Sequence, residues 1–157
     1  YRGAKFSMFE GGLRVPAIIS WPGKLPEGAV RDQVSHSCDW LPTLTELAGV
    51  KLQRKDIDGL SLTNVIKNED ALTPHKVLHW QIGRGNNPRW AVREGDWKLL
   101  GNPQDTSNKA LLTTKDKLFL TNLKENMNEM VNLAEKHPDV TQRLKKLHDE
   151  WAAKNVK

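Results

Sequence analysis

A near-continuous run of apolar residues over 13–21 predicts a buried strand early in the chain. Such a run is typical of a strand that is covered on both faces of a parallel sheet. Pro16 fits only near the start of this strand, where no ladder donor is needed. The apolar positions of the run are Val15, Ala17, Ile18, Ile19 and Trp21.

The next segment changes to helical periodicity and predicts a helix that begins at Asp39. Asp39 is a suitable N-cap, Pro42 lies in the first turn, and Gly49 follows the last turn. The apolar positions at i, i+3 and i+7 are Leu41, Leu44 and Ala48. A strand followed by a helix is the α/β pattern. We therefore expect residues 1–70 to be the end of an α/β domain with a larger mixed sheet, with a short helix near 60–66.

Residues 71–157 have a different pattern and predict a small α+β subdomain. The expected strands cover 77–82, 89–93, 96–100 and 117–120, and the middle two form a hairpin around Glu94 and Gly95. Pro138 opens a last helix. Its apolar stripe is Val140, Leu144, Leu147 and Trp151. The prediction is an antiparallel sheet with one packed C-terminal helix.

Amino-acid composition excludes few classes of function. The chain has 157 residues, a net charge of +5 and one cysteine. A single cysteine excludes an internal disulfide. No apolar run is long enough to predict a membrane span. The mild positive charge suits an anionic substrate but is equally typical of solvated surface. No nucleic-acid-binding motif or dense basic stripe is present.

The most specific motif lies at the start of the chain. Residues 3–16 read Gly-x-Lys-x4-Glu-Gly-Gly-x-Arg-x-Pro, and Trp-Pro-Gly follows at 21–23. Further motif segments cover 39–49, 58–62, 90–99 and 118–134. In this order, over nearly the whole chain, these segments resemble the C-terminal portion of the sulfatase family. That family contains arylsulfatase-like members of the alkaline-phosphatase superfamily.

The resemblance implies a sulfuric ester hydrolase whose nucleophile lies outside this chain. Sulfatases oxidise the first residue of a Cys/Ser-x-Pro-x-Arg motif to formylglycine, and they bind a calcium-like ion through upstream side chains. The only cysteine, Cys38, does not lie in that motif. The chain alone is therefore expected to be inactive and to need the remainder of the catalytic domain. The implied substrate is a sulfated carbohydrate or an aryl sulfate, and the implied location is periplasmic, secreted or lysosomal.

Lys5 is the leading candidate for a catalytic and substrate-binding residue. The resemblance places it where sulfatases have a lysine that contacts the substrate sulfate. A fixed ammonium stabilises the charge that builds up on the sulfuryl and leaving oxygens in the transition state. A solvated surface lysine is the alternative. For Glu10 and Arg14 we favour structural roles, with Arg14 satisfying a carboxylate or loop carbonyls. Gly11 and Gly12 are expected to supply backbone angles that a Cβ forbids.

The second group of substrate-binding candidates lies in and beside the predicted loop at 83–88. His79 precedes this loop, and by loose resemblance to sulfatases it contacts substrate. A core histidine is the alternative. Arg84 and Asn86, together with Asn87 and Arg89, make a polar, cationic loop that suits glycan recognition. The alternative is an ordinary surface loop whose residues are polar because they face water. The two tryptophans of the hairpin, Trp90 and Trp97, are expected in the core.

Two other functions fit the sequence. One is a related hydrolase of phosphonate or phosphate esters. The other is a non-catalytic module that binds sulfated glycans, which predicts a well-folded isolated chain. A sulfatase portion predicts instead that Ile18, Ile19 and Trp21 expose an apolar face in the absence of neighbouring strands.

Overall fold

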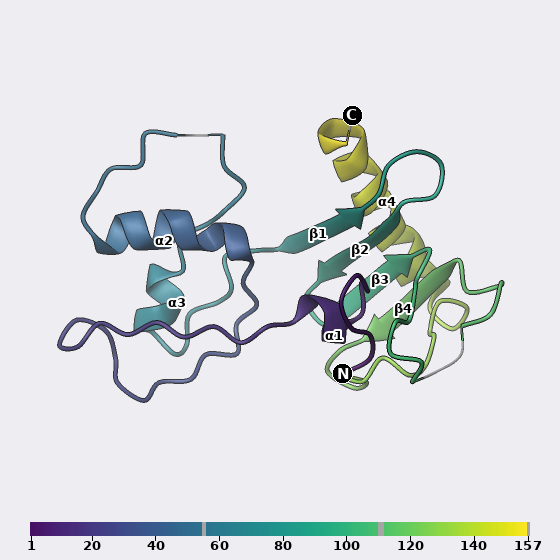
Figure 1. Cartoon of the computed structure of the whole chain (residues 1–157), viewed down its shortest axis with the longest axis horizontal. Coiled ribbons are helices and arrows are strands. Elements are labelled where there is room, and N and C mark those ends of the chain that lie inside the picture. The colour runs from purple at the N-terminus through teal and green to yellow at the C-terminus, as the bar shows by residue number, and fades with distance from the viewer. Residues whose placement is uncertain (55, 110–111, 157) are drawn as a thin grey trace. The chain divides into compact units, whose positions relative to one another are not determined.

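The computed structural model describes residues 1–54, 56–109 and 112–156, and the chain divides into two units. One unit comprises Tyr1–Pro16 and Val77–Lys157, and the other comprises Ala17–Lys76. The first unit carries the sheet, and the second carries short helices (Figure 1). The assignment of 1–70 and 71–157 to separate domains of an intact protein stays a prediction.

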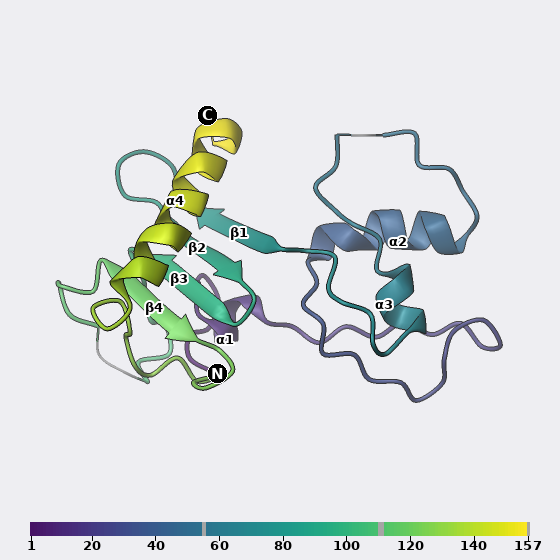
Figure 2. The ribbon, with the colours of Figure 1, turned by 180° about the vertical axis from the view of Figure 1, so that it is seen from behind.

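The sheet unit contains a four-stranded antiparallel meander in the order β1-β2-β3-β4. The strands are β1 (Val77–Ile82), β2 (Arg89–Glu94), β3 (Trp97–Gly101) and β4 (Leu118–Asn122). Gly95, at φ 57°, turns the tight β2–β3 hairpin, in which Glu94 pairs with Trp97. The helix α4 (Pro138–Asn155) crosses one face of this sheet (Figures 1 and 2). The predicted sheet with one packed C-terminal helix is confirmed.

The face of the sheet beneath α4 holds one half of the core. Alternate strand residues point to it, so Val92, Leu99 and Leu120 are fully buried against Leu144. Val140 and Leu147 pack on the same cluster, which confirms the predicted apolar stripe of α4. Trp90 and Trp97 also belong to this side, as expected for core residues.

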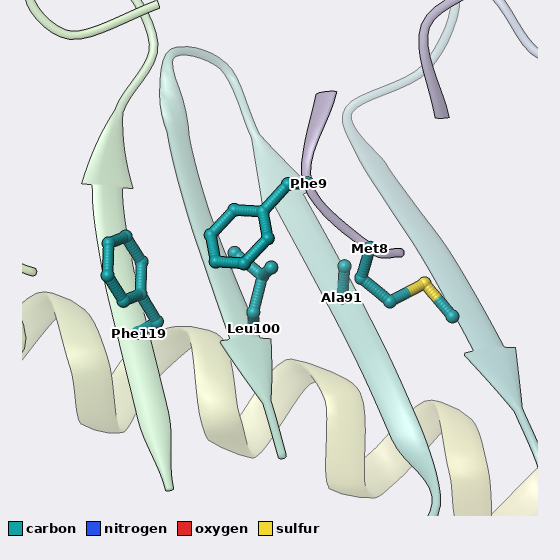
Figure 3. Packing of buried hydrophobic residues seen from close by; sticks show 5 residues of the cluster. All are labelled: Met8, Phe9, Ala91, Leu100 and Phe119. Carbon is teal, nitrogen blue, oxygen red and sulfur yellow. The ribbon is translucent and has the colours of Figure 1, made fainter. Parts of the chain in front are cut away.

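The opposite face of the sheet is covered by the N-terminal segment and the short helix α1 (Glu10–Leu13). Figure 3 shows Met8 and Phe9 lying over Ala91, Leu100 and Phe119. The rings of Phe9 and Phe119 meet edge to face, with centroids 5.2 Å apart and planes at 85°. The motif that begins the chain is therefore packed on the antiparallel sheet.

The second unit is built around a buried carboxylate. Its elements are a 3-10 turn η1 (Ser37–Asp39), α2 (Trp40–Leu47) and α3 (Thr63–Lys67). Asp39 is the N-cap residue of α2, as predicted, but its side chain makes no capping bond to that helix. Its oxygens accept instead from the backbone N–H groups of His36 and Leu60 and lie 2.8 Å from His75 Nε2. Because η1 runs directly into α2, the Trp40 N–H already bonds the Ser37 carbonyl.

The predicted strand over 13–21 is not formed. Residues 14–21 form neither a helix nor a strand, and among the described residues no strand pairs with them. A strand needs a neighbour for its ladder hydrogen bonds, and without one the apolar run stays in solvent. Val15 is 78% exposed and Ile18 is 93% exposed. The predicted apolar face of α2 is also uncovered, since Leu41 and Leu44 are about half exposed.

Candidate functional site

Lys5 lies at the tip of a tight turn. The Ser7 N–H donates to the Ala4 carbonyl at 2.9 Å, which leaves Lys5 and Phe6 as the two central residues of a β-turn. Phe6 has φ 71°, in the left-handed region. The Lys5 side chain is exposed, and its Nζ lies 5.1 Å from the centroid of the Phe6 ring. The turn therefore presents an ammonium group at the surface of the sheet unit.

The loop between β3 and β4 holds this turn in place. The Gly3 N–H donates to Ser107 Oγ and the Ala4 N–H donates to Thr106 Oγ1, both at 2.9 Å. The buried Ser7 hydroxyl donates to the Gln104 carbonyl at 2.7 Å. These bonds tie both ends of the turn to a segment about a hundred residues further along the chain.

Arg89 is the one residue of the predicted cationic loop group that reaches the Lys5 turn within the described residues. Its Nη1 donates to the Phe6 carbonyl at 3.0 Å and also bonds Gln104 Oε1. The sequence pattern predicted one recognition loop that contains Arg84, Asn86 and Arg89. The structure instead gives Arg89, the first residue of β2, a backbone partner in the motif turn.

Gly11 and Gly12 are needed for close approach. A Cβ on Gly11 meets the Gly3 carbonyl oxygen at 2.2 Å, and a Cβ on Gly12 meets the Ser7 carbonyl oxygen at 2.2 Å. Neither glycine has a positive φ. The prediction that they supply forbidden backbone angles is therefore wrong. They let α1 pack directly against the backbone of the Lys5 turn.

Beneath the turn lies a cluster of buried charges that the sequence did not reveal. Lys98 Nζ lies 2.7 Å from Glu10 Oε1 and 3.1 Å from Glu129 Oε1. Glu129 Oε2 accepts the Glu10 N–H at 2.5 Å. Burial raises the pKa of Glu129, although the Lys98 ammonium opposes that shift. The structural role predicted for Glu10 is confirmed, and its partner is a lysine at a core-facing position of β3.

A second buried cation, Arg2, completes this layer. Its Nε lies 2.8 Å from Asp105 Oδ2, and its Nη1 donates to the Glu129 carbonyl at 2.9 Å. The guanidinium also stacks 4.1 Å from the centroid of the Phe9 ring. Arg14, by contrast, is exposed and donates to Met127 Sδ at 3.2 Å. Within the described residues Arg14 has no carboxylate or carbonyl partner, unlike our expectation.

His79 lies on the other face of the sheet from the Lys5 turn. Its ring stacks on Trp151 of α4, with centroids 5.0 Å apart and planes at 1°. Burial lowers the pKa of His79, which favours the neutral imidazole. This placement is that of a core histidine. The structure does not bring His79 and Lys5 together, so substrate contact by His79 stays a prediction.

Arg84 and Asn86 lie in the exposed loop between β1 and β2. Arg84 lines a shallow surface depression together with Gln81, Gly83 and the end of α4 at Asn155 and Val156. The far end of the loop is anchored by Asn102, whose Nδ2 donates to the Pro88 carbonyl at 2.8 Å. Arg84 and Asn86 remain available for a ligand, as a group separate from Lys5 and Arg89.

Neither a metal centre nor an activated cysteine is found among the described residues. Within 1–54, 56–109 and 112–156, no group of three or more His, Cys, Asp or Glu side chains is arranged to hold a metal ion. Burial and the neighbouring Asp39 carboxylate raise the pKa of the exposed Cys38 thiol. That shift disfavours the thiolate, the form that acts as a nucleophile. No helix in these ranges is long and apolar enough to cross a membrane.

Comparison with known proteins identifies relatives along almost the whole chain. Residues 4–156 match the family model described as N-sulphoglucosamine sulphohydrolase, C-terminal. Human arylsulfatase A is 30% identical over 163 residues, which covers 93% of this chain and 32% of that protein. The chain thus spans about a third of the length of that relative.

Two solved structures share the fold. The crystal structure of Ps i-CgsB in complex with k-i-k-neocarrahexaose has a TM-score of 0.75 and 24% identity, over 95% of this chain and 31% of that one. The structure of BT4656 in complex with its substrate D-glucosamine-2-N,6-O-disulfate has a TM-score of 0.53 and 24% identity, over 73% of this chain and 23% of that one. At this identity the likeness concerns the fold alone.

Proposed function

The chain belongs to the sulfatases, in the family described as N-sulphoglucosamine sulphohydrolase, C-terminal, and we propose that the intact protein hydrolyses sulfate esters. In the reaction, water cleaves the ester to give an alcohol and sulfate. The substrate class that we propose is a sulfated carbohydrate. A solved protein of the same fold, BT4656, is in complex with its substrate, a glucosamine disulfate. An aryl sulfate is the second possibility, since arylsulfatase A is also a relative.

We assign Lys5 to the sulfate group of that substrate. The supporting observation is the construction of its turn: both ends are bonded to the β3–β4 loop, Arg89 holds the Phe6 carbonyl, and two glycines admit α1 beneath it. A surface lysine without a role needs no such scaffold. A cation held in a fixed place stabilises developing sulfuryl charge without reorganisation during the reaction.

The nucleophile and the metal ion belong, in this proposal, to other parts of the intact protein. The formylglycine expected of a sulfatase would supply the attacking group. A calcium-like ion held by those other parts would supply further positive charge to stabilise the sulfate. Among the described residues no group of side chains is arranged to hold a metal ion, and the buried Glu10 and Glu129 share the Lys98 ammonium. No role in holding the ion is therefore given to this chain. A periplasmic, secreted or lysosomal location is proposed on family grounds.

Replacing Lys5 in the full-length protein tests this role. Lys5→Ala is expected to cost about 2–4 kcal/mol of transition-state stabilisation, measured as a fall in kcat/KM on a sulfate ester. Lys146→Ala is the matched control. Lys146 is an exposed lysine of α4, on the far side of the sheet, and its loss is expected to leave kcat/KM unchanged. An unchanged kcat/KM for Lys5→Ala would remove Lys5 from the mechanism.

The relatives do not favour the two alternative functions, and assays on the same full-length protein test them. Paired assays on a sulfate ester and the matching phosphate ester are expected to show preference for sulfate. A preference for phosphate would point to the related phosphonate or phosphate ester hydrolases. Salt-sensitive glycan binding with no turnover would point to a binding module.

A further inference from the structure

Phe6 occupies a backbone position that suits glycine better. It is the third residue of the Ala4–Ser7 turn and has φ 71°. A turn with positive φ at this position normally takes glycine or asparagine. For a bulky residue the left-handed region is an outlier that the surroundings must enforce. Here the enforcing contacts are the Arg89 bond to the Phe6 carbonyl and the anchored ends of the turn.

The Phe6 side chain gains no compensating burial in this chain. It is 59% exposed, whereas the neighbouring Phe9 is fully buried in the sheet core. The ring lies near the Lys5 ammonium, whose Nζ is 5.1 Å from the ring centroid. An ammonium within about 6 Å of an aromatic ring centroid is attracted by the ring. The contact that distinguishes phenylalanine from glycine here is therefore the one with Lys5.

We propose that Phe6 is a positioning residue for Lys5, kept in a strained conformation so that its ring holds the ammonium in place. This inference rests on the proposed role of Lys5 in sulfate binding. A lysine has a long, flexible stem, and ordering it costs conformational entropy. The ring offsets part of that cost before the substrate arrives. Its effect should then appear in the chemical step, where a fixed cation contributes most.

The test uses kcat and KM of the full-length protein on a sulfated monosaccharide or an aryl sulfate. Phe6→Gly relieves the backbone strain but removes the ring. We expect an unchanged or raised melting temperature together with a fall of about 2- to 5-fold in kcat, the equivalent of one exposed cation–π contact. Phe6→Leu keeps the strain and much of the bulk, and it is expected to show the same fall. Phe6→Tyr keeps the ring and should retain wild-type kcat.

A double-mutant cycle separates positioning from other roles. If Phe6 acts through Lys5, then Phe6→Gly has no further effect in a Lys5→Ala background. The same fall in both backgrounds, a loss confined to KM, or wild-type kcat for Phe6→Gly would each overturn the inference. A lower melting temperature with loss of activity in all three Phe6 variants would indicate a packing role and would also overturn it. Failure of the proposed function itself is distinguishable, because Lys5→Ala would then be fully active.

Discussion

At the scale of single residues, the stability of the motif segment depends on one lysine. Lys98 is fully buried, and its single ammonium lies within ion-pair distance of two carboxylates from distant parts of the chain, Glu10 and Glu129. Removing one partner of a buried ion pair leaves an uncompensated charge, which costs far more than the pair contributes. The cluster also carries the N-terminus of α1, because Glu129 accepts the Glu10 N–H.

Lys98→Met is therefore expected to lower the free energy of unfolding by about 3–5 kcal/mol, the typical cost of breaking a buried pair. Urea unfolding followed by tryptophan fluorescence measures this loss. The pKa of Glu129 is already raised by burial. The Lys98 ammonium holds that pKa down, so its removal raises the pKa of the folded Glu129 carboxyl further. The variant therefore gains more stability than the wild type by binding a proton, and its deficit should shrink as the pH falls from 8 toward 5.

Lys117→Met is the matched control for this measurement. Lys117 is exposed just before β4, and removal of a surface charge is expected to change stability by less than about 0.5 kcal/mol. A Lys98→Met variant as stable as the control would mean that Glu10 and Glu129 find other partners or are solvated.

The residue scale also shows where sequence reasoning failed. The sequence pattern correctly indicates that the Gly-Gly pair is structural, but it suggests backbone angles as the reason why glycine is needed there. The reason is the carbonyls of Gly3 and Ser7, which lie where a Cβ of Gly11 or Gly12 would stand. Such an approach depends on two segments meeting in space, which periodicity does not encode. The buried role of Lys98 was unpredictable for the same reason, because its strand is otherwise mostly apolar and its partners are distant in sequence.

At the scale of elements, α4 and the four strands were predictable because each carries its own periodic signal. The apolar stripe of α4 and the alternation of β2 and β3 gave bounds within a few residues of those observed. The contact between them was not predictable. His148 of α4 stacks on Trp90 of β2 with ring centroids 4.0 Å apart, and His79 of β1 stacks on Trp151. Two histidines therefore lie in the helix–sheet interface.

This interface predicts weaker docking of α4 in acid. Burial, and to a lesser degree the nearby His79 and Lys145, lower the pKa of His148 from 6.5 to about 4, against the opposing effect of Asp149. Its Nδ1 is buried with no hydrogen-bond partner among the described residues. Between these two pKa values the unfolded histidine binds a proton that the folded one does not. Stability is thus complete above pH 6.5 and falls as the pH is lowered toward 4.

We expect the free energy of unfolding to fall by about 1–2 kcal/mol between pH 7.5 and pH 5 through His148 alone. His148→Phe keeps an aromatic ring against Trp90 and removes the titrating group. The variant should lose that part of the pH dependence, as measured by thermal unfolding at the two pH values. An identical pH dependence in His148→Phe and wild type would mean that the interface does not exclude the proton.

At the scale of the whole molecule, the apolar segment 14–20 is the main departure from the sequence-based expectation. Its composition is that of a buried strand, yet it forms no strand and is largely exposed. The apolar pattern correctly indicates residues that favour a buried strand. Whether they pair depends on whether a neighbouring strand is present. The chain spans about a third of its relative arylsulfatase A. We therefore expect the segment to be paired and covered in the intact protein.

The last prediction follows from this exposure. A contiguous apolar surface in water favours association. The isolated chain should therefore self-associate at micromolar concentrations and bind a hydrophobic dye, as measured by light scattering and fluorescence. Ile18→Asp should reduce both signals, because Ile18 is 93% exposed in the unpaired segment. Val131→Asp, at a 55% exposed site in the sheet unit, is the control and should have little effect.

In the full-length protein, Ile18→Asp should instead destabilise the fold, because the charge would be buried within a sheet. A monomeric isolated chain that binds no dye, together with a stable full-length Ile18→Asp variant, would mean that this segment is a surface linker in the sulfatase.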